Sequence, residues 1–102
     1  VGEGRPALLN YLTDDCSACK RMLRTTFVDP EIVAESERFT TAMINLTDVD
    51  RSNPAVWADF VERYGSPGVP VVALYDSTGS LRRVFTEYVD RDRMLEALRE
   101  LQ

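Results

Sequence analysis

Residues 7–20 read ALLNYLTDDCSACK and contain Cys16 and Cys19, the only two cysteines of the chain. The run 7–12 is almost wholly apolar, which is typical of a strand in a sheet that is covered on both faces. A helical pattern follows from about Cys16 to Leu23. The N-terminus of a helix stabilises a thiolate, and a second cysteine one turn later can close a short disulfide. The stretch therefore predicts dithiol–disulfide chemistry.

The composition indicates one globular domain. A length of 102 residues with 44% apolar content suffices for one domain with a modest core. The net charge of −5 argues against nucleic acid as a partner, because phosphate binding needs a basic face. No apolar run approaches the roughly 20 residues of a membrane span, so we expect no direct membrane insertion of this chain. Histidine is absent, which excludes His-based catalysis and most zinc enzymes.

The chain has no internal repeat and no second domain in its sequence pattern. We expect residues 1–6 to be a leader or linker and residues 7–102 to form the domain. Residue 1 is Val and no signal peptide is visible, so we interpret the chain as a mature protein or an excised domain.

The remaining elements follow from caps and from apolar periodicity. Polar caps predict helix starts at Asp29-Pro30, Asn53-Pro54 and Asp90. The middle helix should end at Gly65 and carry an apolar stripe of Val56, Trp57, Phe60, Val61 and Tyr64. Further strands are predicted over 39–46, 71–75 and 81–85, the last two joined by a turn at 76–79.

This order of elements predicts an α/β fold. It is a four-stranded mixed sheet flanked by helices on both faces. The first strand should be central, which places Cys16 at its carboxyl end, where open α/β sheets hold their sites.

Three motifs together carry a resemblance to a known family. They are Cys16-Ser17-Ala18-Cys19-Lys20, Thr26-Phe27-Val28-Asp29-Pro30 and Gly68-Val69-Pro70. They resemble the thioredoxin superfamily, and within it the C-terminal thioredoxin-like domain of the DsbD family, bacterial inner-membrane proteins that relay electrons to periplasmic partners. The resemblance covers roughly residues 6–101. It implies a thioredoxin-like fold in which Pro70 is cis and faces the disulfide.

The expected activity is protein-disulfide reduction, or thiol–disulfide interchange, by a periplasmic reductant or relay. Cys16 is the expected exposed nucleophile, and Cys19 is the buried cysteine that resolves the mixed disulfide. Substrate-binding contacts are expected from six residues, namely Asp15, Ser17, Ala18, Gly68, Val69 and Pro70. We expect no metal and no cofactor beyond the Cys16–Cys19 disulfide.

The same interpretation extends to partners and location. The expected partners are protein dithiols and disulfides, reached through a transient mixed disulfide, with a membrane-embedded domain as electron donor. We expect a monomer in a periplasmic or other extracytoplasmic location, with the cytoplasm as the alternative.

Four positions depart from the family pattern. Asp15 replaces a Trp, Asn10 a buried carboxylate, Leu23 an acid, and Glu87 a Gly that faces the groove. Asp15 is expected to disfavour a Cys16 thiolate and also to be the N-cap of the helix, whereas Asn10 removes a charge that would disfavour a thiolate nearby.

Other interpretations of the cysteine pair stay open at this stage. The pair could be a static disulfide, although so short a loop stabilises little, or half of a zinc site, which would require a dimer. The chain could also be a general soluble thioredoxin, or a docking module of this fold without catalytic activity. The direction of electron flow depends on a reduction potential that the sequence does not supply.

Overall fold

The computed structural model describes residues 4–47, 54–65 and 68–101 of the chain. Its elements run in the order β1 (Ala7–Leu12), α1 (Ser17–Arg24), α2 (Pro30–Ser36), β2 (Thr40–Asn45), α4 (Pro54–Tyr64), β3 (Val71–Tyr75), β4 (Leu81–Phe85) and α5 (Arg91–Glu100). The strands form one sheet in the order β2-β1-β3-β4. β1 is parallel to β2 and antiparallel to β3, so the predicted mixed sheet with an interior first strand is confirmed.

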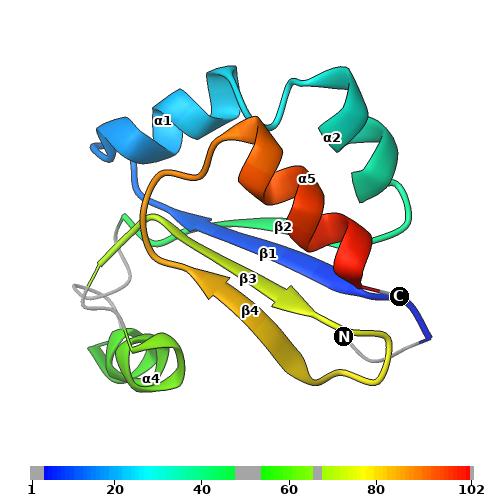
Figure 1. Ribbon diagram of the computed structural model, residues 1–102. Coiled ribbons are helices and arrows are strands. Elements are labelled where there is room, and N and C mark those ends of the chain that lie inside the picture. Colours follow the sequence, from blue (N-terminus) through cyan, green and yellow to red (C-terminus); the bar gives the residue numbers. More distant parts are fainter. Residues whose placement is uncertain (1–3, 48–53, 66–67, 102) are drawn as a thin grey trace.

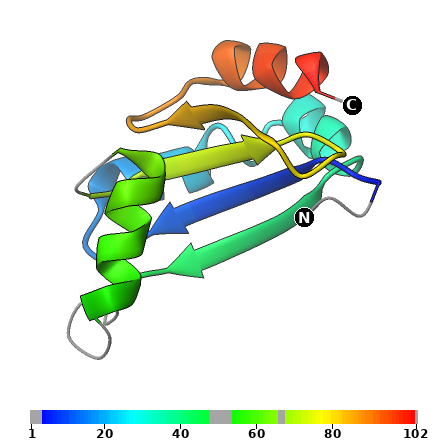
Figure 2. The same ribbon diagram turned by 90° about the horizontal axis from the view of Figure 1, so that it is seen from below.

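Helices cover both faces of this sheet, as predicted. Figure 1 shows α1, α2 and α5 on one face and α4 on the other. Helices α1, α2 and α5 cover an apolar cluster that includes Leu8, Leu74 and Met94. The opposite face carries a separate cluster around Phe60, Tyr64 and Val71. In Figure 2, α4 runs across the strands near the end where β1 and β2 finish and β3 begins.

The strand register brings three loop segments to this one end of the sheet. Leu12, the last residue of β1, lies opposite Asn45, the last residue of β2. Tyr11 lies opposite Val71, the first residue of antiparallel β3. Residues 13–16, 46–47 and 68–70 therefore lie at the carboxyl end of β1, where Figure 1 shows the start of α1.

The predicted helix caps are partly confirmed. Asp29 accepts hydrogen bonds from the N–H groups of Glu31 and Ile32, and Asp90 accepts one from Arg93 N–H. Asp15 as the cap of α1 is wrong, because the N-cap is Cys16. The predicted cap Asn53 lies outside the described residues.

One part of the apolar stripe on α4 is also wrong. Phe60 and Tyr64 are buried as predicted, whereas Val56 is 46% exposed. A helix lying on a sheet buries only one side, and Val56 lies at the flank of that side. None of the helices in the described ranges is long and apolar enough to cross a membrane.

Candidate active site

Cys16 is placed by the turn between β1 and α1. Its backbone is extended (φ −82°, ψ 104°), and its N–H donates to Thr13 O at 3.3 Å. Its Sγ accepts a hydrogen bond from Cys19 N–H at 3.1 Å, which satisfies one of the free N–H groups of the first helical turn. The Cys16 sulfur therefore lies at the positive end of the α1 dipole, where a thiolate is stabilised.

Cys19 differs from Cys16 in its burial. The Cys19 residue is 2% exposed, whereas Cys16 is only partly buried. The two cysteines form a disulfide with a Cα–Cα distance of 5.2 Å. Within this pair, only Cys16 presents surface to a partner.

Contacts from distant parts of the chain hold α1 in place. Thr26, which is 0% exposed, donates from Oγ1 to Val89 O at 2.6 Å, and Val89 N–H lies 3.4 Å from Met22 Sδ. Thr25 Oγ1 and Tyr88 OH lie 3.0 Å apart, and the hydrogen bond with Thr25 lowers the pKa of the Tyr88 phenol. The segment after β4 thus anchors the helix that carries the cysteines. These residues have no signal in the sequence, because no local periodicity links positions 63 residues apart.

The segment before β3 lies at the same end of the sheet as Cys16. The Val69–Pro70 peptide bond is cis, the isomer that the family resemblance implies. Pro70 is buried, whereas Gly68 and Val69 are partly buried and Val69 packs against the cluster beneath α4. The register of β1 and β3 therefore brings the two distant motifs, 16–19 and 68–70, to one end of the sheet.

The two carboxylates before Cys16 are both exposed. Asp15 Oδ1 accepts from Thr13 Oγ1 at 2.7 Å, so its side chain turns back to β1 and does not cap α1. Asp14 Oδ1 accepts from Asn45 Nδ2 at 2.8 Å, which ties the cysteine turn to the end of β2. Ser17 is exposed and Ala18 is partly buried.

The remaining departures from the family pattern lie in two places. Asn10 is 6% exposed and its Oδ1 has no hydrogen-bond partner. It lines a hollow of about 240 Å³ together with Leu23, Phe27 and Met43. Glu87 is exposed and lies 3.9 Å from Arg93 Nη1 of α5, so its expected place facing the groove stays a prediction.

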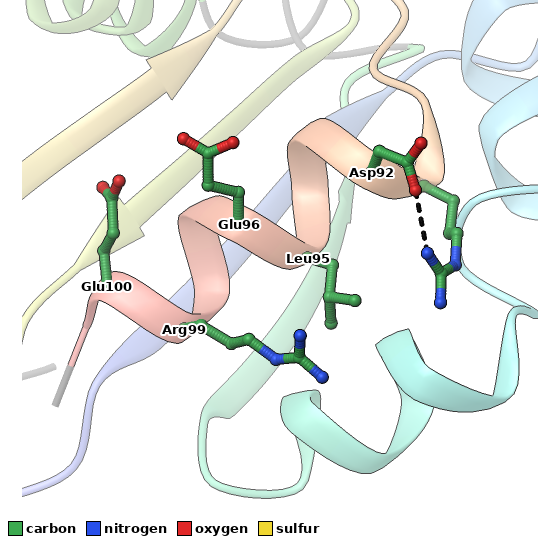
Figure 3. A pocket seen from close by; sticks show the side chains of 6 residues that line it. Asp92, Leu95, Glu96, Arg99 and Glu100 are labelled. Atoms are coloured by element: carbon green, nitrogen blue, oxygen red, sulfur yellow. Dashed lines mark hydrogen bonds and ion pairs between the residues drawn. The ribbon is translucent and has the colours of Figure 1, made fainter.

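The surface of α5 carries another hollow, of about 480 Å³ (Figure 3). The arginines at this hollow already have carboxylate partners. Arg91 contacts Asp29, Glu31 and Asp92, and Arg99 contacts Glu31 and Glu35. These ion pairs join α5 to α2, so both guanidinium groups are already engaged within the protein. Within the described ranges, no group of three or more potential ligand residues could hold a metal ion.

Comparison with known proteins agrees with this geometry. The chain is similar to the thiol:disulfide interchange protein DsbD of Haemophilus influenzae, with 29% identity over 70 residues, which are 69% of this chain and 11% of that protein. The chain thus spans about a tenth of the length of the curated relatives it matches.

Two solved structures extend the comparison. The C-terminal domain of DsbD from Neisseria meningitidis in the reduced form superimposes with a TM-score of 0.76 and 27% identity, covering 98% of this chain and 84% of that one. The exposed lipoprotein thioredoxin of Streptococcus pneumoniae gives a TM-score of 0.70 at 21% identity, covering 98% and 87%, and supports the fold alone. The family model of the thioredoxin-like domain matches residues 1–102. The chain therefore belongs to the family of thioredoxin-like domains.

Proposed function

We propose that this chain is a thiol–disulfide oxidoreductase that passes electrons to disulfides of partner proteins through Cys16 and Cys19. The observation that carries the proposal is the contrast within the disulfide. Cys16 lies partly exposed at the N-cap of α1, and Cys19 is 2% exposed behind it. The similarity to thiol:disulfide interchange proteins supports the same activity.

The exchange proceeds in two steps. The Cys16 thiolate attacks one sulfur of the partner disulfide, a mixed disulfide forms, and the other partner sulfur leaves as a thiolate that takes up a proton. The Cys19 thiolate then attacks Cys16 Sγ, and the mixed disulfide breaks. The partner gains two electrons and two protons, and this chain is left with the Cys16–Cys19 disulfide.

The partner contacts are proposed at the same end of the sheet. Ser17 and Ala18 lie between the two cysteines, and residues 68–70 precede β3 at the same end of the sheet. The Val69 backbone would pair with an extended partner segment, and Asp15 would contribute charge beside the nucleophile.

We further propose that the chain acts as a reductant or relay in an extracytoplasmic compartment, and that it receives electrons from a membrane-embedded domain. The proposal is supported by the similarity to DsbD. Exposed Asp14 and Asp15 beside Cys16 disfavour its thiolate, and a strong oxidant needs a stabilised reduced form.

Insulin reduction with dithiothreitol tests the activity. The wild type should turn over, Cys16→Ser and Cys19→Ser should not, and Val28→Ser at an exposed site should match the wild type. Cys19→Ser should trap mixed disulfides, whereas Cys16→Ser should not. If the wild type does not turn over, the proposed activity is wrong and the chain is better explained as a docking module without catalytic activity. If Cys16→Ser traps mixed disulfides, the roles of the two cysteines are reversed.

Equilibration with equal concentrations of reduced and oxidised glutathione tests the direction. A reductant keeps the Cys16–Cys19 disulfide largely formed in this buffer. A mostly dithiol form would indicate an oxidant.

A further inference from the structure

The cations of α1 differ from the other cations of the chain. Lys20, Arg21 and Arg24 are exposed and, among the described residues, contact no carboxylate. Every described arginine from Arg38 onward contacts a carboxylate, and Arg5 donates to backbone carbonyl groups. In the described part of a chain with net charge −5, the cations without such a partner are therefore confined to the cysteine helix.

Two of these cations lie in line with the nucleophile. Lys20 N–H donates to Cys16 O at 3.1 Å, so helical spacing begins at Cys16. Residues four apart share one side of a helix, which places Cys16, Lys20 and Arg24 in one row. A rise of about 1.5 Å per residue sets Lys20 about 6 Å and Arg24 about 12 Å from Cys16 along the axis. The buried residues Cys19 and Met22 face the core.

Arg21 lies beside this row, toward the segment after β4. Its Cζ is 4.3 Å from the centre of the Tyr88 ring, a contact that orders the guanidinium without neutralising it. The acidic residues of that segment are engaged elsewhere, because Glu87 contacts Arg93 and Asp90 caps α5. Lys20, Arg21 and Arg24 together are called the basic face below.

The exposed carboxylates near Cys16 lie at the other end of α1. Asp15 is bonded to Thr13 Oγ1 and Asp14 to Asn45 Nδ2, so both are held toward the ends of β1 and β2. The charge therefore changes sign at Cys16, from negative in the turn before it to positive along the helix after it. A helix dipole alone does not explain this pattern, since Lys20 precedes the last turn of α1.

The partner protein itself is the molecule that lies next to the basic face during exchange. This step rests on the proposed function, in which a mixed disulfide joins the partner to Cys16 Sγ. Lys20 is then one helical turn from the new bond, and exposed Ser17 between them is small. Carboxylates of the partner would lower the energy of this complex, and cations would raise it.

We propose that the basic face selects partners that carry carboxylates about 6–12 Å from their reactive sulfur, and that it orients them along α1. The reversed orientation brings the same carboxylates toward Asp14 and Asp15 and is disfavoured. Lys20 and Arg24 thus determine specificity, while Cys16 and Cys19 carry out the exchange.

Activated peptides test this selection. Each peptide has one cysteine in a mixed disulfide with pyridine-2-thiol, and three versions carry Glu, Gln or Lys at the second and fourth positions after it. In an extended peptide these positions lie about 7 and 13 Å from the cysteine, which matches the row on α1. The Cys16 thiolate bonds to the peptide sulfur, and pyridine-2-thiolate leaves and takes up a proton. Absorbance of the released thione gives the rate constant.

The deciding quantity is the ratio of the rate constants for the Glu and Lys peptides. Loss of a cation near Cys16 also makes its thiolate less stable, but this slows all three peptides alike. With the reduced wild type at low salt, the ratio should be about three to ten, from two exposed ion pairs. It should approach one in 1 M salt, where the Debye length is about 3 Å. A ratio of one or less at low salt overturns the proposal.

Charge-removing variants identify the surface. Lys20→Gln/Arg24→Gln should lower the ratio to about one or below, because Asp14 and Asp15 remain. Arg82→Gln/Arg83→Gln is the matched control, which removes the same charge from β4 at the end of the sheet away from Cys16. The control should keep the wild-type ratio.

The outcomes separate this proposal from the proposed function. Equal loss of the ratio in both double variants would assign the selection to net charge and overturn a role of α1. An unchanged ratio in Lys20→Gln/Arg24→Gln would also overturn it, while exchange at Cys16 stands. A reduced wild type that reacts with none of the peptides contradicts the proposed function itself.

Discussion

The two faces of the sheet are built differently. The face under α1, α2 and α5 has a large apolar core in which Met22, Met94 and Leu98 are 0% exposed. The face under α4 has a smaller cluster in which Tyr11, Tyr64 and Tyr75 are joined through their hydroxyl groups at 2.9 Å each. The first face carries the cysteine helix, so the proposed chemistry rests on the better-buried half. The helix that carries Cys19 therefore packs, through Met22, on the larger of the two apolar clusters.

The largest effect should come from the core under α5. Leu98→Ala should lower the free energy of unfolding by about 3 kcal/mol, because a fully buried side chain is replaced by a cavity. Val56→Ala on α4, at a site 46% exposed, should change it by less than about 0.5 kcal/mol. Urea denaturation measures both. Similar losses of unfolding free energy in the two variants would show that the two faces of the sheet do not differ in packing.

The next largest loss of stability should come from removing the buried hydrogen bond that anchors the end of α1. Thr26→Val keeps the shape of the side chain but removes the donor to Val89 O, and should cost about 1–2 kcal/mol of unfolding free energy. Thr86→Val, at an exposed position after β4, is the control and should be nearly neutral. An unchanged urea midpoint for Thr26→Val would mean that apolar packing alone holds α1.

The tyrosine chain on the α4 face should contribute less. Tyr64→Phe removes the central hydroxyl and should cost about 1 kcal/mol, because Tyr11 and Tyr75 lie near the surface and regain hydrogen bonds with water. Tyr75→Phe in the same background should add little, since its partner is already absent. Additive losses in the double variant would show that the two hydroxyl groups act independently.

The smallest effect should be an alkaline loss of stability specific to the same face. Burial, together with the hydrogen bond to Tyr64, raises the pKa of Tyr75 from 10.0 to about 12. The native state thus favours the protonated phenol, so this contribution is complete below pH 10 and is lost as pH rises toward 12. Denaturation midpoints of the wild type should fall more steeply over this interval than those of Tyr75→Phe. Equal slopes would exclude Tyr75 as the titrating group.

Local signals predicted most of the elements. The sequence predicts the first strand at 7–12, where β1 lies, and α1 within one residue of its ends, because apolar runs and helical spacing depend only on neighbouring residues. The caps Asp29 and Asp90 were also correct. Asp15 was not, since Cys16 itself caps the helix while Asp15 bonds to Thr13. In the sequence, Asp15 and Cys16 can each be the N-cap of α1, and only the path of the backbone decides which of them it is.

Motif spacing and family resemblance predict the residues of the candidate site. They do not predict the hydrogen bonds that hold the end of α1 in place. Cys16, Cys19 and the 68–70 segment are recognisable by residue type and order. The bond from Thr26 to Val89 and the contact of Thr25 with Tyr88 join residues 63 apart. Such pairs exist only once the fold has brought the segment after β4 beside the segment after α1.

The sequence by itself determined that this chain has two cysteines on a helix start, four strands and caps at defined positions. Tertiary structure alone decided that Cys16 and not Asp15 caps α1, that Val56 is exposed, and that β2 lies at one edge of the sheet formed by the described strands. The physical reason is the range of the interactions. Caps, turns and periodicity act within a few residues, whereas burial depends on which distant segments pack together.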